Sequence, residues 1–377
     1  MARTRTTILQ AALCAALAFG LCPSPTVAER FETEQAEVEV TVLADGLDHP
    51  WGMAFLPDGG LLITERSGSL RRFRDGTLLE APVEGVPEVW NRGQGGLLDI
   101  ALHPDFSETR WVYLSYARPG DGGAGTAVAR ARLEEGALQG LELLFDLPRK
   151  TGSPQHFGSR LAFDRQGYLF VTVGERGARD RAQDPHDPAG SVLRLHDDGS
   201  IPEDNPFADG EKGHPAVYSY GHRNPQGLAL NPFTGEIWEQ EHGPQAGDEI
   251  NIVRPGANYG WPEETHGEEY GGGRIGPAEA PGFVSPVHDW TPSIAPSGMA
   301  FYDGGLFPEW KGDLFNGSLK FKLVSRLELD RDDAMAEERF LEDAYGRIRD
   351  IEVGPDGALY LLTDSSDGQL LRLAPPR

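Results

Sequence analysis

One short pattern recurs six times along this chain. An apolar segment leads into a turn rich in Pro, Asp or Gly, and a second apolar segment follows the turn. The two clearest copies share the turn Pro-Asp-Gly, at Pro57 and at Pro355. The copies lie at residues 53–65, 161–175, 228–241 and 351–364, with looser copies at 100–105 and 299–303. A chain built from one recurring unit is predicted to fold as a repeat structure.

Each unit has the character of several short β-strands joined by tight turns. Several copies continue into a third apolar segment, as at 70–73, 192–195 and 370–373. A spacing of about 45 to 70 residues with several strands per unit is typical of a propeller blade, and the 48 Gly and 29 Pro residues suit frequent turns. Two packed β-sandwiches would not explain one unit recurring from 47 to 373. The sequence therefore predicts an all-β, six-bladed β-propeller.

The first 28 residues have the pattern of a secretory signal peptide. Arg3 and Arg5 precede an apolar run over 8–21, and small residues follow up to Ala28. The run is too short to span a membrane as a helix. Both cysteines, at 14 and 22, fall inside this segment, so we expect a mature chain of residues 29–377 that has no disulfide and no membrane span. Its predicted location is the periplasm or the medium.

The chain is strongly acidic, with a formal net charge of −25, which becomes −27 once Arg3 and Arg5 are removed. This charge is the opposite of what a nucleic-acid-binding protein carries, so nucleic acid is excluded as a partner. An anionic ligand would need a local cluster of basic side chains.

Polar side chains precede the repeated unit at similar offsets. Gln94, His156, Asn224 and the pair Arg347 and Arg349 each lie six to ten residues before the turn position of their own copy. In a propeller the segment that enters the innermost strand lies at the mouth of the central channel, so we expect these side chains to surround one cavity. Arg347 and Arg349 are two apart on a strand-like segment and should point to the same side, which indicates an anion with more than one charged group.

The chain resembles the soluble pyrroloquinoline-quinone (PQQ)-dependent sugar dehydrogenases, in particular their periplasmic aldose sugar dehydrogenase branch. The resemblance covers nearly the whole mature length and is carried by eight motifs in the family's order. These are Gly-Gln-Gly-Gly-Leu-Leu-Asp at 93–99, His-Phe-Gly-Ser-Arg-Leu at 156–161, Gly-His-Arg-Asn-Pro-Gln-Gly at 221–227, Glu-His-Gly-Pro at 241–244, Gly-Asp-Glu-Ile-Asn at 247–251, Asn-Tyr-Gly-Trp-Pro at 258–262, Ser-Leu-Lys at 318–320 and Arg-Ile-Arg-Asp at 347–350.

The resemblance implies an activity and a catalytic residue. His156 matches the family's general base, which takes the proton of the anomeric hydroxyl of an aldose while a hydride passes from that carbon to the quinone. The product would be an aldonolactone, and electrons would leave to an external acceptor. A histidine without this context is more often structural, so the role depends on the motif.

The resemblance also implies a cofactor site and a metal site. Gly243 and Pro244 match the pair whose backbone carbonyls hold Ca²⁺, a cation that prefers oxygen ligands. For Asp248, a negative charge near that ion and a turn-capping role are equally plausible. The side chains matched to the quinone itself are Gln94, Asn224, Ser293, Lys320, Arg347 and Arg349. Arginine suits carboxylates because its planar guanidinium can bind them with two hydrogen bonds; surface salt bridges are the competing interpretation.

One departure from the family leaves the substrate undefined. The glucose-specific branch has aromatic residues before the segment at 291–296, where this chain has Val287-His288-Asp289-Trp290. Sugar contacts therefore do not carry over, and the preferred aldose stays open. Two other functions also stay open: a calcium-dependent propeller hydrolase for lactones or esters, which has no use for three converging cations, and a non-catalytic binding propeller.

Overall fold

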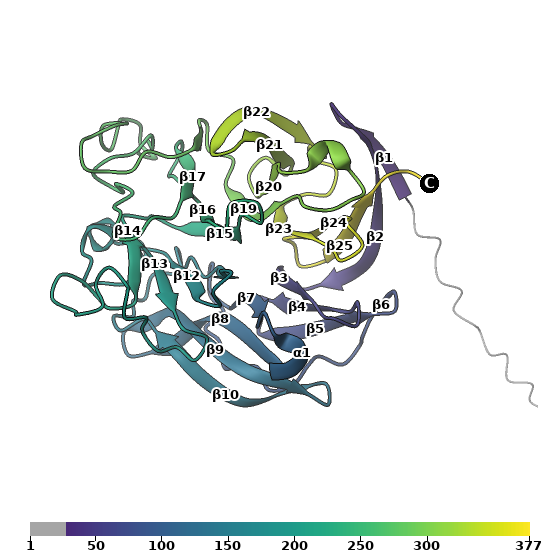
Figure 1. Cartoon of the computed structure of the whole chain (residues 1–377), viewed down its shortest axis with the longest axis horizontal. Coiled ribbons are helices and arrows are strands. Elements are labelled where there is room, and N and C mark those ends of the chain that lie inside the picture. Colours follow the sequence, from purple (N-terminus) through teal and green to yellow (C-terminus); the bar gives the residue numbers. More distant parts are fainter. Residues whose placement is uncertain (1–27) are drawn as a thin grey trace, which may run out of the picture.

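The computed structural model describes residues 28–377. It contains six antiparallel sheets arranged around a central axis, which confirms the predicted six-bladed β-propeller (Figure 1). The predicted signal segment lies outside the described residues, apart from Ala28, where the first strand begins.

Five blades are consecutive four-stranded sheets that run from the axis outward. Blade 1 contains β3 (Pro50–Phe55), β4 (Leu61–Glu65), β5 (Ser69–Arg74) and β6 (Thr77–Leu78). Blade 2 contains β7 (Leu97–Leu102), β8 (Trp111–Gly120), β9 (Gly123–Glu134) and β10 (Ala137–Asp146), with the short helix α1 (Phe106–Thr109). Blade 3 contains β11 (Leu161–Phe163), β12 (Leu169–Val173), β13 (Ser191–Leu195) and β14 (Val217–Tyr220), with the 3₁₀ turn η1 (Arg179–Gln183). Blade 4 contains β15 (Pro225–Leu230), β16 (Ile237–Glu241), β17 (Asp248–Ile252) and β18 (His288–Trp290). Blade 5 contains β19 (Pro296–Phe301), β20 (Leu314–Ser318), β21 (Val324–Asp330) and β22 (Asp333–Phe340), with the 3₁₀ turn η2 (Pro308–Trp310).

Blade 6 joins the two ends of the described chain. Its inner strands are β23 (Ile348–Val353), β24 (Leu359–Thr363) and β25 (Gly368–Ala374), and its outer strands are β2 (Glu37–Leu47) and β1 (Ala28–Glu32). The N-terminal strand β2 pairs antiparallel with β25, for example Val40 with Leu373. This pairing closes the ring of blades, as the neighbouring purple and yellow strands in Figure 1 show.

The repeated unit of the sequence is the inner half of each blade. Every copy begins in an innermost strand, so the six copies correspond to β3, β7, β11, β15, β19 and β23. Four of them continue through the turn into the second strand, while the copies at 100–105 and 299–303 end before it. The second strands of blades 1, 3 and 4 are buried along their whole length because each lies between neighbouring blades. The apolar and β-branched residues of β4 and β12 fit that position, whereas β16 buries Glu239, Gln240 and Glu241 there.

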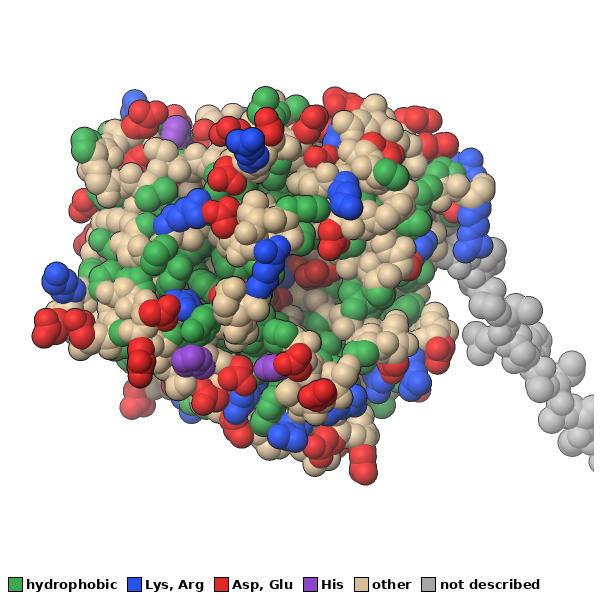
Figure 2. Space-filling model, in the orientation of Figure 1, with side chains coloured by type: hydrophobic (Ala, Val, Ile, Leu, Met, Phe, Trp, Pro, Cys, Tyr) green, Lys and Arg blue, Asp and Glu red, His purple; other side chains and the backbone are tan. Residues whose placement is uncertain are grey.

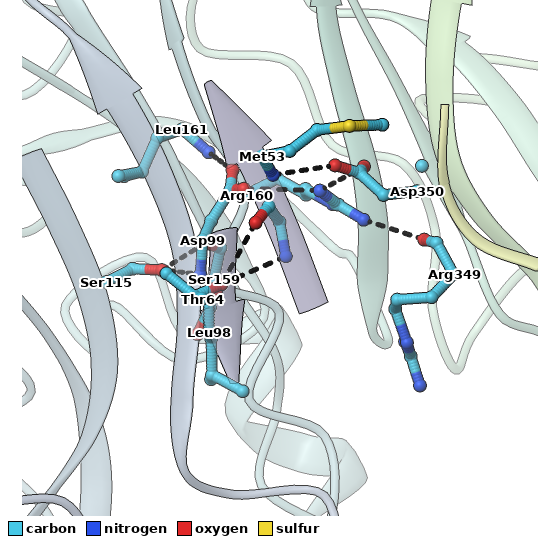
Figure 3. A network of polar contacts seen from close by, with 12 residues as sticks. Met53, Thr64, Leu98, Asp99, Ser115, Ser159, Arg160, Leu161, Arg349 and Asp350 are labelled. Carbon is cyan, nitrogen blue, oxygen red and sulfur yellow. Dashed lines mark hydrogen bonds and ion pairs between the residues drawn. The ribbon is translucent and has the colours of Figure 1, made fainter. Parts of the chain in front are cut away.

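One buried arginine ties three of the innermost strands together at the axis. The guanidinium of Arg160 contacts Asp350 Oδ1 on β23 at 2.7 Å and Asp99 Oδ1 on β7 at 3.2 Å (Figure 3). It also lies over the indole of Trp51 on β3. It also donates to the carbonyl oxygen of Arg349 at 3.0 Å. The network fixes the segments that carry the predicted site residues.

No helix within residues 28–377 is long and apolar enough to cross a membrane.

Candidate functional site

Two adjoining cavities lie on the side of the ring where the chain enters the innermost strands. The first, the arginine compartment, has a volume of about 230 Å³ and is lined by Trp51, Arg66, Gln94, Leu98, Phe157, Gly158, Gln226, His242, Ala295, Leu319, Arg347 and Arg349. The second, the histidine compartment, has a volume of about 300 Å³ and is lined by Gln94, His156, Arg223, His242, Gly243, Pro244, Gln245, Tyr270, Ser293, Ala295 and Lys320. Gln94, His242 and Ala295 line both, so the compartments form one site. Figure 2 shows the molecular surface hollowed near the centre of the ring.

His156 is buried in the wall of the histidine compartment and faces a carboxylate. Its Nδ1 lies 2.9 Å from Glu175 Oε1, close but not aligned as an ideal hydrogen bond. Burial lowers the pKa of His156, the nearby Arg223 and Arg176 lower it further, and Glu175 opposes them. The ring is therefore neutral at neutral pH. With its Nδ1 proton directed to Glu175, Nε2 retains the lone pair that a general base needs.

The backbone at His156 is left-handed, which is unusual for a residue with a side chain. Its φ is 57°, and Gly158 and Ser159 also have positive φ angles. The carboxamide oxygen of Gln94 accepts the His156 backbone N–H at 2.7 Å and supports this conformation. A Cβ at Gly158 would lie 2.7 Å from the Gly174 nitrogen, so only glycine fits there. Such backbone strain is common at functional sites.

Arg347 and Arg349 both line the arginine compartment and share one buried carboxylate. Arg349 Nη2 lies 2.8 Å from Asp364 Oδ2, and Arg347 Nη2 lies 3.1 Å from the same oxygen. The prediction that the two arginines point to the same side is thus confirmed, and the competing interpretation as salt bridges is also partly correct. Lys320 forms no ion pair within residues 28–377. Together, Lys320, the two arginines and Asp364 have a net charge of +2.

The free donor of this cluster is Lys320. It lines the histidine compartment, and its Nζ makes no hydrogen bond or ion pair within residues 28–377. Two further donors without partners, Arg349 Nε and Asn224 Nδ2, are sealed from the cavity. Asn224 lies behind the cavity wall, where its carboxamide oxygen accepts the Gly158 N–H at 3.1 Å. An anionic ligand with carboxylates and carbonyl oxygens, as PQQ is, fits the positive charge of Lys320, Arg347 and Arg349.

The turn at Gly243 and Pro244 is held by Asp248, whose side chain is buried. Asp248 accepts hydrogen bonds from the N–H of Gly243 at 2.8 Å, the N–H of Ala295 at 2.7 Å and the hydroxyl of Ser293 at 2.6 Å. Burial raises the pKa of Asp248 to about 6, and these bonds oppose the rise. Asp248 thus caps the turn, and the proton of Ser293 is engaged by Asp248.

The carbonyl groups of this turn have capacity left for a cation. The Gly243 carbonyl accepts one N–H from Arg223 at 3.0 Å, and the Pro244 carbonyl accepts none from the described backbone. Because a carbonyl oxygen has two lone pairs, both could ligate Ca²⁺. A Cβ at Gly243 would lie 2.1 Å from the Ala246 carbonyl oxygen, so glycine is required at this position.

The comparison with known proteins agrees with this geometry. Residues 47–372 match the family "Glucose / Sorbosone dehydrogenase". The chain belongs to that family. The aldose sugar dehydrogenase YliI of Escherichia coli K12 is 46% identical over 364 residues, which cover 95% of this chain and 98% of the relative.

Solved structures of glucose/sorbosone dehydrogenase relatives superpose over most of both chains. The apo form of the soluble aldose sugar dehydrogenase of E. coli is 47% identical, with a TM-score of 0.87 and coverage of 90% of this chain and 100% of that one. The PQQ-bound form of aldose sugar dehydrogenase from Streptomyces coelicolor is 32% identical, with a TM-score of 0.73 and coverage of 90% and 99%. The resemblance found in the sequence motifs is confirmed.

The structure adds site residues of this glucose/sorbosone dehydrogenase that the sequence analysis missed. They are Trp51, Arg66, Glu175, Arg223, Gln226, His242 and Asp364. Two of them had a visible signal, because Glu175 and Asp364 occupy the acidic position that ends the repeated unit in copies 161–175 and 351–364. Arg223, Gln226 and His242 lie inside the motifs at 221–227 and 241–244 but were given no role there, and Trp51 and Arg66 follow from spatial neighbourhood alone.

Proposed function

We propose that this protein oxidises the anomeric carbon of aldose sugars to aldonolactones, using PQQ as hydride acceptor and Ca²⁺ beside it. The observation that carries the proposal is the juxtaposition of a neutral, carboxylate-oriented His156 with a cluster of Lys320, Arg347 and Arg349 in one site. A lactone hydrolase needs a base such as His156, but it does not need the cluster of three cations.

The residues divide the work between binding and proton transfer. Lys320, Arg347 and Arg349 bind the carboxylates of the quinone, and Gln94 and Ser293 supply polar contacts from the cavity wall. Asn224 supports that wall from behind through its bond to Gly158. The carbonyl groups of Gly243 and Pro244 ligate Ca²⁺. When bound, the quinone supplies the two-electron acceptor and the ion polarises its carbonyl as a Lewis acid.

His156 removes the proton that the reaction releases. As the hydride leaves the anomeric C–H, the O–H bond of the same carbon breaks and its proton moves to Nε2 of His156. The electron pair of that O–H bond forms the carbonyl of the lactone. Glu175 stabilises the imidazolium that results and keeps the ring in one orientation. An external electron acceptor then restores the quinone.

The location of the protein follows from its N-terminal segment. We propose that residues 1–28 direct export and that residues 29–377 act as a single propeller domain in the periplasm or the medium. The absence of cysteine from 29–377 is compatible with that environment.

Reconstitution of the apo protein tests the proposal. Dye-linked dehydrogenase activity toward aldoses should arise only when PQQ and a calcium salt are both added, and a chelator added beforehand should prevent it. Magnesium in place of calcium is the matched control. Activity that needs calcium alone and hydrolyses lactones would replace the proposal by a hydrolase.

A further inference from the structure

His242 stands between the two compartments and has no part in the proposed reaction. It follows β16 directly and precedes the turn at Gly243 and Pro244. Its ring lines both the arginine and the histidine compartments. One edge of the ring is thus open to the site, while the rest is enclosed by protein.

The hydrogen bonding of His242 fixes which nitrogen carries the proton. Nε2 lies 2.7 Å from the backbone carbonyl oxygen of Pro296. A carbonyl oxygen only accepts, so Nε2 must be the N–H donor. No carboxylate forms an ion pair with His242 within residues 28–377, and the cations Arg349 and Arg223 line the two compartments beside it. A positive charge on the ring would therefore lack a partner. The ring is neutral, and Nδ1 has a lone pair and no proton.

Nδ1 of His242 is an uncommitted acceptor. It makes no hydrogen bond within residues 28–377 and is not sealed away from the cavities. The other side-chain acceptors that line the arginine compartment are engaged. Gln226 Oε1 accepts from Arg349 at 3.1 Å, and Gln94 Oε1 accepts from the His156 backbone.

The rest of this compartment presents donors. Arg66, Arg347 and Arg349 supply N–H groups that suit the carboxylates and carbonyl oxygens of PQQ. At neutral pH the carboxylates and carbonyl oxygens of PQQ only accept hydrogen bonds, and its pyridine nitrogen is also an acceptor. The pyrrole N–H is the one donor on the oxidised cofactor. The arginine compartment, with its donors and one free side-chain acceptor, is complementary to a ligand of acceptors with one donor.

We propose that Nδ1 of His242 accepts the pyrrole N–H of the quinone and thereby sets which edge of the ring system faces this wall. The inference rests on the proposed function, because it takes PQQ as the ligand. His242 is a cofactor-positioning residue in this scheme, not the base.

Two substitutions separate this contact from the structural bond to Pro296. In His242→Gln, the amide N–H can still reach the Pro296 carbonyl, but no acceptor replaces Nδ1. In His242→Asn, the carboxamide oxygen lies near the former Nδ1 position, while the bond to Pro296 is lost. The measurement is equilibrium binding of PQQ to each apo variant with calcium present, followed by quenching of tryptophan fluorescence, alongside urea unfolding of each apo variant.

His242→Gln should bind PQQ about 2- to 13-fold more weakly than wild type, the loss expected for one neutral hydrogen bond. Its unfolding should match wild type. His242→Asn should lose less affinity despite lower stability. Methylating the pyrrole nitrogen of PQQ should weaken binding to wild type more than to His242→Gln.

Wild-type affinity in His242→Gln, or equal losses in both variants, would overturn the inference. If wild type gains calcium-dependent dehydrogenase activity with PQQ while His242→Gln binds PQQ as tightly as wild type does, only the positioning role of His242 is wrong. If wild type does not bind PQQ, the proposed function itself is wrong.

Discussion

Replacing Asp364 by Asn removes the charge on which both cavity arginines converge. The side chains of Asp364 and Arg349 are 6% and 7% exposed, so their pair is buried, whereas Arg347 is 45% exposed and its pair is screened by solvent. Removing one partner of a buried ion pair costs about 3–5 kcal/mol. The Asn oxygen still accepts a hydrogen bond, so we expect the free energy of unfolding of the apo protein to fall by ~3 kcal/mol at neutral pH.

The effect of this substitution should depend on pH in one direction. Burial raises the pKa of Asp364, but Arg349, His49 and Arg347 together hold it well below its usual range. A carboxylate with a lowered folded-state pKa stabilises the protein above its unfolded pKa of about 3.9, and this contribution is lost as pH falls through the folded value. The gap between wild type and Asp364→Asn should stay constant from pH 7 to about pH 5 and shrink below about pH 4.

Urea unfolding of both apo proteins at several pH values measures this gap. Asp356→Asn is the matched control, because its pair with Arg372 belongs to the same blade but is 28–40% exposed. That substitution should cost about 0–1 kcal/mol. Equal losses for Asp364→Asn and Asp356→Asn would refute the claim that Asp364 holds the arginines in place. Bound PQQ should reduce the loss in Asp364→Asn, since its carboxylates replace the missing partner.

Substitutions at three further residues test the chemistry of the site. His156→Gln should lower turnover by about a hundredfold or more with little change in PQQ affinity, the effect of losing a positioned base; retention of more than about a third of wild-type turnover would exclude that role. Glu175→Gln removes the charge that raises the pKa of His156, so the acidic limb of the kcat/KM profile should move to lower pH; an unmoved limb would mean that Glu175 does not act on His156. Arg349→Ala should weaken PQQ binding by about 10- to 150-fold, and Arg349→Lys should recover part of the loss; equal half-saturation for Arg349→Ala and wild type would mean that Arg349 does not face the cofactor.

The fold was predictable because its information is local and repeated. Four copies carry a strand, a turn and a second strand, and all six copies match innermost strands. The closure of the ring was not predicted, because β2 lies outside the repeated unit. Its partner β25 begins at Gly368, more than three hundred residues further along the chain. Pairing over such a separation leaves no local signal.

The site was predicted in part, for a related reason. Motifs marked the base and the cations, but the groups that hold them in place come from neighbouring repeats. Glu65 and Glu241 are the last residues of the second strands β4 and β16, whereas Asp364 follows β24 by one residue and Glu175 follows β12 by two. Each of these four carboxylates is buried and contacts a basic side chain. A comparison of the copies with one another, column by column, would have found them.

Because β2 completes blade 6, the axial site can form only after the last strand of the chain has been synthesised. Arg347 directly precedes β23 and Arg349 lies in it. This strand is the innermost one of blade 6, the blade that both ends of the described chain complete. During synthesis every other blade can be present while the axial site still lacks one wall. The site therefore exists only after the last strand, β25, has been made and has paired with one of the first. A nascent or C-terminally shortened chain that carries His156 and both arginines would still be unable to retain its cofactor, which places cofactor loading after chain completion.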